Sequence, residues 1–219
     1  RINGFGVAKL HLHAFIVTLG TQLIAQGLCS IFIESQPSGT AQALSTFQRG
    51  FLDFSAGNLT IGGLRIPNVV IYFVIIAIIM GVIWNKTRLG KNMFAVGSNA
   101  DAAKVSGVNV FWTTVMVHTL AGAMYGVTGF IEGARISSIT QSAGLNYECD
   151  AIAACVIGGV SFVGGTGKIS GIVLGVFVLR IIFVALSMLG IDPSMQYIIK
   201  GGIILAACSL DMRKYLAKK

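Results

Sequence analysis

The stretch IPNVVIYFVIIAIIMGVIW, residues 66–84, runs directly into the connector NKTRLGKNMFAVGSNADAAKVSGVNV, residues 85–110. The first stretch is apolar along nearly its whole length, and about 20 apolar residues in a helix suffice to cross the hydrocarbon core of a bilayer. The connector is basic and carries Lys86, Arg88, Lys91 and Lys104. Because basic connectors tend to stay on the cytoplasmic side, this junction predicts a helical membrane protein with a cytoplasmic connector.

The composition of the whole chain supports the same class of protein. Of its 219 residues, 54% are hydrophobic and 11% are charged, which is too apolar for a soluble domain. The net charge of +8 does not indicate nucleic-acid binding, because the basic residues lie beside apolar stretches rather than in a stripe with exposed aromatic residues. The cysteines form no C-x-x-C pair and predict neither disulfides nor a metal site: Cys29, Cys149, Cys155 and Cys208.

Six stretches are candidates for membrane spans: residues 14–33, 66–84, 111–131, 150–165, 169–189 and 193–210. They predict an all-α fold, a polytopic transmembrane bundle that forms a single domain over residues 1–219. The fourth stretch is short and ends in glycines, so we expect a short or broken crossing element that faces the protein interior. In the loop between the first two spans, a short surface helix is expected around residues 41–51.

The distribution of basic residues predicts the orientation. With both termini in the cytoplasm, 11 of the 16 basic residues lie inside and three lie outside. If residues 150–165 did not cross, the basic tail from Arg213 to Lys219 would lie outside, against the usual asymmetry. We therefore expect a multi-pass membrane protein with a cytoplasmic C-terminus.

Polar residues recur every fourth position in the first span, at Thr18, Gln22, Gln26 and Ser30, which places them on one helical face. Two interpretations stay open. The stripe either makes hydrogen bonds to a neighbouring helix or forms the wall of a path for a hydroxyl-rich solute such as a sugar, because these side chains donate and accept without charge.

Ionisable residues inside the other spans are functional candidates. His118 shares a helical face with Gly122 and Gly126, where close helix packing is the first interpretation and a proton relay the second. Arg180 lies near the middle of the fifth span, where its partner is interior water, a backbone carbonyl or a substrate. Lys200, in the sixth span, can extend its ammonium group outward, and Asp150 or Asp192 could reach these cations from the outer rim.

The connector holds the signals of a short, capped helix. Asn99 is a good N-cap, Asp101 falls in the first turn, Lys104 falls in the last, and Gly107 can end the helix in the left-handed conformation. A helix of about two turns is not stable alone in water and needs a surface to lean on. That surface is either the protein's own helices or a separate motor protein that docks from the cytoplasm.

No motor of its own is visible in the sequence. The run GGTGK, residues 164–168, lacks the spacing of the phosphate-binding motif G-x-x-x-x-G-K-[ST]. No catalytic triad, cofactor motif or metal-ligand cluster is present either, so the sequence predicts a non-enzymatic chain. Energy for uphill transport would have to come from another chain.

These features together resemble the permease subunits of bacterial ABC importers for monosaccharides, most closely the galactose/methyl galactoside type, with the ribose type nearer than any amino-acid permease. The resemblance extends from about Trp84 to the C-terminus, and more loosely over residues 3–20. It rests on WNKTRLGKN (84–92), FAVGSN (94–99), AAKVSGVNV (102–110), DAIAA (150–154), GGVSFVGGTG (158–167) and QYIIKG (196–201).

The resemblance implies a location in the bacterial cytoplasmic (inner) membrane and three protein partners: an ABC ATPase subunit, an extracytoplasmic sugar-binding protein and a second permease copy. It implies that a coupling helix fits a groove on the ATPase subunit through Asn99, Ala100, Asp101, Ala102, Ala103, Lys104, Ser106 and Gly107. It also implies a structural motif at Asp150, Gly158, Gly159, Ser161, Gly164, Gly165 and Gly167. Candidates for the sugar path are Thr18, Gln22, Gln26, His118 and Arg180.

The chain departs from the family pattern in two respects. Family members have further N-terminal spans, so we expect the chain to be truncated before Arg1, and Cys149 stands where leucine is expected. The predicted substrate is galactose or a methyl galactoside, with ribose or another pentose as an alternative. A secondary carrier coupled to ions or protons is an alternative of another class, although the spans offer no obvious paired acid.

Overall fold

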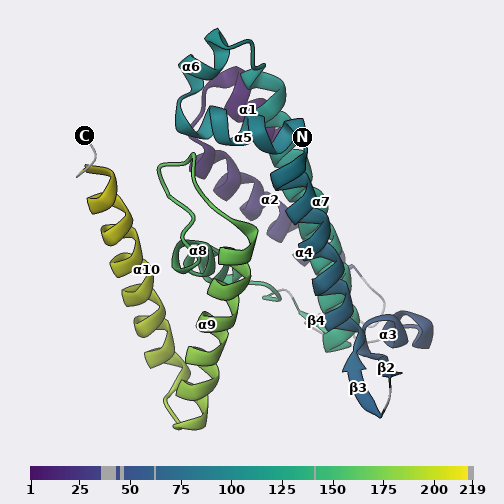
Figure 1. The fold of residues 1–219 in the computed structure, drawn as a ribbon. Coiled ribbons are helices and arrows are strands. Elements are labelled where there is room, and N and C mark those ends of the chain that lie inside the picture. The colour runs from purple at the N-terminus through teal and green to yellow at the C-terminus, as the bar shows by residue number, and fades with distance from the viewer. Residues whose placement is uncertain (36–42, 45–46, 62, 141, 217–219) are drawn as a thin grey trace. The chain divides into compact units, whose positions relative to one another are not determined.

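The computed structural model describes residues 1–35, 43–44, 47–61, 63–140 and 142–216, and most of them are helical (Figure 1). The helices are α1 (Ile2–Leu10), α2 (Ala14–Glu34), α3 (Arg49–Ala56), α4 (Asn68–Lys86), α5 (Arg88–Ser98), α6 (Ala100–Val105), α7 (Val110–Ile136), α8 (Tyr147–Ile157), α9 (Ile169–Met188) and α10 (Pro193–Leu216). The strands are β1 (Ala43–Leu44), β2 (Asn58–Ile61), β3 (Leu64–Pro67) and β4 (Ile139–Thr140).

Five helices of the described residues are long and apolar enough to cross a membrane: α2, α4, α7, α9 and the part of α10 up to Arg213. They overlap five of the six predicted spans. Many of their isoleucine, leucine, valine and phenylalanine side chains are exposed, which suits contact with lipid tails. The predicted all-α, polytopic fold class is confirmed.

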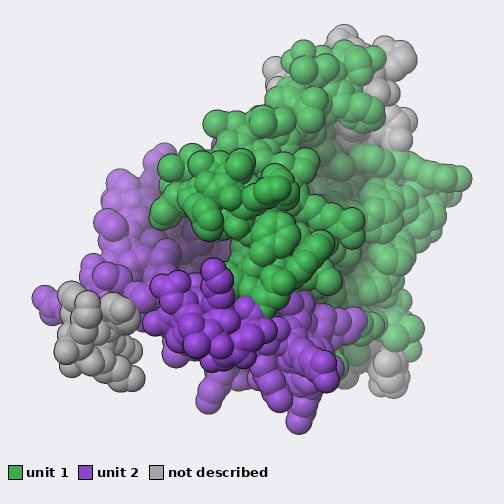
Figure 2. All heavy atoms as spheres, turned by 90° about the horizontal axis from the view of Figure 1, so that it is seen from above, with its two compact units in different colours: residues 1–78, 109–143 green, residues 79–108, 144–219 purple. Residues whose placement is uncertain are grey.

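The chain forms two compact units, which Figure 2 colours separately. Unit 1 comprises residues 1–78 and 109–143, and unit 2 comprises residues 79–108 and 144–219. The division falls inside α4, so this helix begins in unit 1 and ends in unit 2. That the two units make one transmembrane domain stays a prediction from the sequence.

In unit 1, the short helix α1 packs on α7 through a glycine. A Cβ on Gly4 would lie 2.8 Å from the Cα of Val115, closer than a side-chain carbon tolerates. Helix α1 ends where His11 adopts the left-handed conformation, with a φ of 52°. In contrast, a Cβ on Gly122 or Gly126 would meet nothing within 4 Å in the described part of the chain, so the packing contact predicted there is not made within it.

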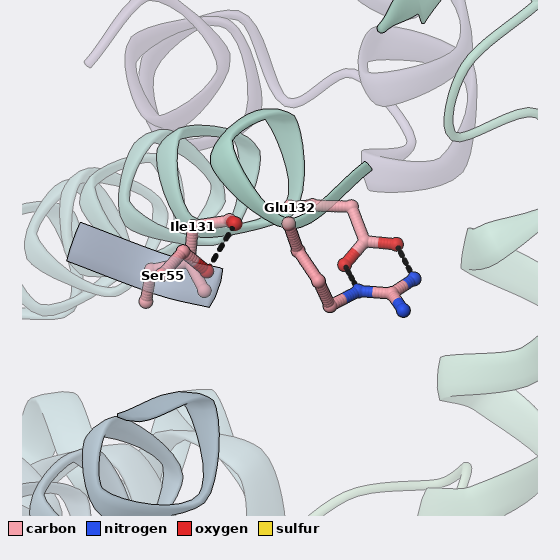
Figure 3. Close-up of polar contacts among 4 residues, drawn as sticks. Ser55, Ile131 and Glu132 are labelled. Atoms are coloured by element: carbon pink, nitrogen blue, oxygen red, sulfur yellow. Dashed lines mark hydrogen bonds and ion pairs between the residues drawn. The ribbon is translucent and has the colours of Figure 1, made fainter. Parts of the chain in front are cut away.

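A second contact of unit 1 joins α3 to the end of α7. The Ser55 hydroxyl donates to the carbonyl of Ile131 over 2.9 Å, and the next residue, Glu132, holds Arg135 through two hydrogen bonds (Figure 3). The rings of Phe51 and Phe54 meet Phe130 edge-on. This polar and aromatic cluster extends α7 beyond the predicted end of the span at residue 131.

The surface helix expected around residues 41–51 is misplaced. The structure places α3 at Arg49–Ala56, and residues 43–44 form β1, which pairs antiparallel with β4. Residues 41, 42, 45 and 46 of that prediction lie outside the described residues. The phenylalanine side chains of α3 pack against α7, and this packing accounts for the position of the helix along the chain. The spacing of apolar residues over so short a segment did not predict that position. A hairpin of β2 and β3, with Gly63 at a φ of 88°, leads into α4.

In unit 2, glycines let α8 and α9 pack backbone to backbone. A Cβ on Gly175 would lie 2.8 Å from the amide nitrogen of Gly158, and a Cβ on Gly158 would lie 2.6 Å from the carbonyl carbon of Gly171. Both distances exclude a side chain, so the two helix axes can approach closely only with glycine at these positions. The core beside this contact consists of Ala153, Ala154 and Leu179.

The predicted fourth span is not one continuous helix. Helix α8 has 11 residues, and residues 158–168 form turns and bends. Asp150 pairs with Lys200 of α10, whereas Ser161 bonds to Asp211 of the same helix. The two α10 positions are separated by about 16 Å of helix, about half of a bilayer core. The segment thus covers about half of the membrane thickness, and a full crossing stays a prediction.

The close contact between α8 and α9 can be tested by a single added methyl group. We predict that Gly175→Ala lowers the free energy of unfolding by about 1–3 kcal/mol, because the methyl group overpacks the contact. Without that clash, Gly→Ala inside a helix would add about 1 kcal/mol. Thermal unfolding of the protein in detergent measures the difference. Gly126→Ala is the control, and equal stabilisation by both substitutions would contradict the contact.

Candidate functional site

The connector folds into two helices rather than into one short helix within a loop. Thr87 caps α5, since its Oγ1 accepts a hydrogen bond from the Gly90 amide over 3.3 Å. The ring of Phe94 on α5 meets Trp84 at the end of α4 edge-on, with the ring centroids 5.5 Å apart. The sequence analysis missed α5, although Thr87 followed by residues with apolar side chains at helical spacing was a readable signal.

The predicted capped helix is confirmed as α6. The side chain of Asn99 accepts a hydrogen bond from the Ala102 amide over 2.9 Å. Asp101 lies in the first turn and Lys104 in the last, as predicted. Gly107 has a φ of 83°, so it ends the helix in the left-handed conformation.

Most of α6 faces solvent. Ala103 is buried and packs towards α5, whereas the other seven predicted coupling residues are exposed: Asn99, Ala100, Asp101, Ala102, Lys104, Ser106 and Gly107. The side chain of Val105 is exposed as well, to 89%. Helix α6 therefore packs on its own chain through Ala103. The rest of its surface, including the apolar side chain of Val105, is exposed.

Immediately before α6, the chain touches the glycine-rich segment 158–168, which we call the glycine loop. A Cβ on Gly97 would lie 2.9 Å from the Gly165 amide nitrogen, and a Cβ on Gly165 would lie 2.9 Å from the Cα of Ser98. Gly164 and Gly165 also have φ values of 100° and 73°, which disfavour any side chain. The end of α5 and the glycine loop thus meet backbone to backbone.

Asp211 of α10 anchors the glycine loop. Its Oδ2 accepts hydrogen bonds from the Ser161 hydroxyl over 2.9 Å and from the Phe162 amide over 2.8 Å. The Ser161 Oγ in turn accepts from the Val163 amide over 3.2 Å. Sequence analysis did not identify Asp211; the only signal was an acidic residue in the otherwise basic end of the last span.

The other members of the predicted structural motif have separate positions. Gly158 belongs to the contact between α8 and α9, and Gly167 packs against Val160 within the loop. Gly159 has a φ of 82° and no described atom near its missing side chain. Asp150 lies in the first turn of α8, away from the loop.

Asp150 lines a cavity between α8, α9 and α10, all in unit 2. The cavity has a volume of about 520 Å³. Lys200 forms an ion pair with Asp150, and its ammonium group lies 5.2 Å from the centroid of the Phe183 ring and 5.3 Å from that of Tyr197. Arg180 also lines the cavity. The prediction that Asp150 could reach one of the cations within the spans is confirmed for Lys200.

The remaining candidates for a sugar path lie in unit 1. The Thr18 hydroxyl donates to carbonyls of its own helix, at Ala14 and Phe15. On the same helix Gln22 is half-buried and Gln26 is exposed. The Nδ1 atom of His118, on α7, lies 2.9 Å from the carbonyl oxygen of Thr114. Arg180 belongs to unit 2. Their role in transport stays a prediction.

Comparison with protein families decides the class of the chain. Residues 1–208 match the model of a family described as the branched-chain amino acid transport system / permease component. The chain belongs to this permease family. No solved protein structure matches it significantly.

Individual relatives in this permease family carry sugar names. The chain is 45% identical over its whole length to the galactose/methyl galactoside import permease protein of Salmonella typhimurium. It is 36% identical, again over its whole length, to the L-arabinose transport system permease protein of Escherichia coli, and 35% identical over 97% of its length to the ribose import permease protein of Bacillus subtilis. The chain spans 64%, 63% and 63% of the lengths of these relatives.

The cap of α6 can be tested locally. We predict that Asn99→Ala destabilises the helix by about 1 kcal/mol, because the Ala102 amide loses its acceptor. Hydrogen exchange at the amides of Ala102 and Ala103 should become about fivefold faster, by the corresponding shift of the local opening equilibrium.

Asn109→Ala is the matched control, since Asn109 caps α7 by the same bond to Trp112. It should leave exchange in α6 unchanged. Unchanged exchange in the Asn99 variant would contradict the role of this cap.

Proposed function

We propose that the chain is the transmembrane permease of an ATP-driven importer of galactose, methyl galactoside or a similar monosaccharide. Its membership of the permease family, its five helices able to cross a membrane and its 45% identity to a galactose/methyl galactoside import permease protein support this function. The chain itself is not catalytic in this proposal, and a separate ABC ATPase subunit hydrolyses ATP. An extracytoplasmic sugar-binding protein supplies the sugar, and a second permease copy completes the membrane part.

The observation that carries the proposal is the exposed surface of α6. A helix of six residues is too short to persist by its own backbone bonds, yet this one is capped at Asn99 and anchored by buried Ala103. Rigid placement of an exposed Ala102, Lys104 and Val105 is what a docking helix requires. We therefore assign the ATPase groove as the surface that covers them.

Contacts of the glycine loop support a cytoplasmic C-terminus in this proposal. Gly165 of the loop touches Ser98 of the connector, and Ser161 of the loop bonds to Asp211 near the end of α10. Within unit 2 the connector and the C-terminal end of α10 therefore lie on the same side. Because the connector is basic, we place both in the cytoplasm of a bacterial inner membrane; Lys218 and Lys219, which also favour this side, lie outside the described residues.

In this proposal the glycine loop transmits motion from α6 to the spans. Gly97 and Ser98 lie just before α6. The backbone of Gly97 touches Gly164 and Gly165 without an intervening side chain, and Ser98 touches Gly165 with its backbone and its hydroxyl group. A packed backbone contact transmits displacement because interiors are dense and compress little. The displacement then reaches α8 and α9, which flank the loop, and α10 through Asp211.

The sugar path in the proposal includes the polar stripe of α2, with Thr18, Gln22 and Gln26, and the face of α7 around His118. Arg180, which lines the cavity of unit 2, is a separate candidate for contact with the sugar. A pentose is the alternative substrate, favoured less because the ribose and L-arabinose relatives are 35–36% identical.

A carrier coupled to protons is the second candidate function, and the ion pair of Asp150 with Lys200 is the observation in its favour. The two functions differ in energy source. Uptake that stops when an uncoupler collapses the proton gradient, while cellular ATP remains, would identify the carrier.

The docking role of α6 predicts a selective defect. Val105→Asp should abolish binding of the ATPase subunit and reduce uptake at least tenfold, because a carboxylate replaces an apolar contact of about 1.5–3 kcal/mol. The permease should still insert and fold, since the side chain is exposed. Co-purification with the ATPase subunit, together with sugar uptake in vesicles, measures both effects.

Leu59→Asp provides the control, since Leu59 is an exposed apolar residue on the β2–β3 hairpin. This variant should retain the ATPase subunit. Normal binding and uptake in the Val105 variant would exclude α6 as the docking helix.

Asp211→Asn tests transmission through the glycine loop. The amide keeps the shape of the side chain but loses the charge that strengthens its bonds to Ser161 and Phe162. We expect the ATPase subunit to remain bound and to hydrolyse ATP, while the sugar transported per ATP falls several-fold. Asp192→Asn is the matched control, because Asp192 accepts a bond from the Ser194 amide over 2.7 Å at the other end of α10. An unchanged ratio of sugar to ATP in the Asp211 variant would remove the loop from the coupling path.

A further inference from the structure

The cavity of unit 2 lies at a depth that suits a transport site. Arg180 is eight residues before the end of α9, and Lys200 is seven residues after the start of α10. With a rise of about 1.5 Å per residue, both lie about 10–12 Å from the hairpin that joins these helices. In the orientation proposed above, that hairpin faces the outside. The cavity then occupies the outer half of the membrane.

The hydrogen-bond acceptors that line the cavity are held in position by neighbouring residues. Lys200 holds Asp150 by an ion pair, and the side chain of Asp150 is still 38% exposed, so its carboxylate can accept further bonds. The amide nitrogen of Gln196 donates to the carbonyl of Ile191 over 3.0 Å and to the Ser187 hydroxyl over 3.3 Å. Both bonds use the nitrogen, so the amide oxygen of Gln196 remains an acceptor.

The donors come from Arg180 and Tyr197. Arg180 is exposed, and none of the hydrogen bonds or ion pairs described in this structure involves its guanidinium group. That group offers five N–H donors in a rigid fork, which matches two adjacent oxygens on one ligand. Tyr197 adds a hydroxyl and an aromatic ring, and Phe183 adds a second ring.

The combination suits a ligand that is rich in hydroxyl groups. The acceptor oxygens of Asp150 and Gln196 require donors from the ligand, and Asp150 offsets the charge of one of the two cations in the lining, Arg180 and Lys200. The guanidinium of Arg180 requires acceptors and repels a cation. A hydroxyl group satisfies both because it donates and accepts. The volume of about 520 Å³ lies in the usual range of small-molecule sites.

We infer that this cavity is a monosaccharide-binding subsite of the permease, in which Arg180 binds two adjacent sugar hydroxyls and Asp150 and Gln196 accept hydrogen bonds from others. The Asp150–Lys200 ion pair holds the carboxylate in position and lowers the net charge that the sugar meets. The inference rests on the proposed function, since the cavity binds the sugar that the transporter imports.

The experiment uses the full-length permease with its ATPase subunit. Equilibrium binding of radiolabelled galactose is measured on this complex in detergent, without the sugar-binding protein. Uptake is measured separately, in vesicles that contain the sugar-binding protein. Arg180→Lys keeps the charge but replaces the fork by a point charge. We expect its galactose dissociation constant to rise about ten- to hundredfold, which is the loss of one hydrogen bond to a charged group.

Tyr197→Phe is the second variant, since it removes one hydroxyl and keeps the ring beside Lys200. Its dissociation constant should rise about threefold to tenfold. The amount of folded complex should stay at the wild-type level in both variants. Arg65→Lys and Tyr125→Phe are the matched controls, because both residues are exposed in unit 1, and neither should change galactose binding.

The outcomes separate the subsite from the function. If the wild-type transporter imports galactose with ATP but neither variant changes binding, the cavity is not a sugar site. If galacturonate competes with galactose in the wild type and not in Arg180→Lys, the cavity takes anions and the inference of a neutral ligand is overturned. If the wild-type transporter imports no sugar at all, the proposed function itself fails. Weaker galactose binding in both variants, with a normal amount of folded complex, supports the subsite.

Discussion

The packing of unit 2 depends on contacts in which backbone meets backbone with no side chain between. Gly97 and Gly165 make such a contact between the connector and the glycine loop, and Gly158 and Gly175 make another between α8 and α9. Glycine at these positions costs conformational entropy, and a membrane offers no hydrophobic force between helices to offset it. The gain is proximity: van der Waals attraction and backbone hydrogen bonds act at full strength only when the chains touch. Helix α6, the docking helix of our proposal, can therefore share its movement with spans that it does not contact.

Helix α10 makes contacts within unit 2 at two places, beside the cavity and beside the glycine loop. Lys200 holds Asp150 beside the cavity, and Asp211 holds the glycine loop beside the connector. The two anchors differ physically. An ion pair that is partly removed from water costs desolvation and stays favourable only while both partners remain in place. A carboxylate that accepts two hydrogen bonds at a loop is a cheaper, local restraint. A rigid helix between them couples the two ends without any further device.

Sequence patterns predicted the structure that depends on neighbouring residues. They did not predict contacts between residues that lie far apart in the chain. Asn99 and Gly107 specify α6 through bonds to residues within four positions, and Asp101 lies in its first turn, so their pattern could be read directly. The apolar spans were readable because a bilayer demands about 20 residues of one kind. Asp211 was not readable, because its partners Ser161 and Phe162 lie about 50 residues away in the chain and nothing in its neighbourhood marks them. The same holds for the contact of Gly97 with Gly165: each glycine run was visible, but which runs meet is decided in three dimensions.

The short fourth segment follows from the same geometry. A helix that crossed the whole bilayer between Asp150 and the connector would need about 20 residues, but α8 has 11 and passes into the glycine loop. Backbone groups of such a loop lose their helical partners, and each one left unpaired and buried away from water costs free energy comparable to a lost hydrogen bond. Asp211 and Ser161 satisfy the amides of Phe162 and Val163, and Ser161 donates its own hydroxyl to Asp211. The broken helix is thus tolerated because a carboxylate on a neighbouring span accepts hydrogen bonds in place of the missing helical carbonyls. The loop that results also touches the connector at Gly97 and Ser98, so the break in the span and the contact with the segment before α6 occur at the same place.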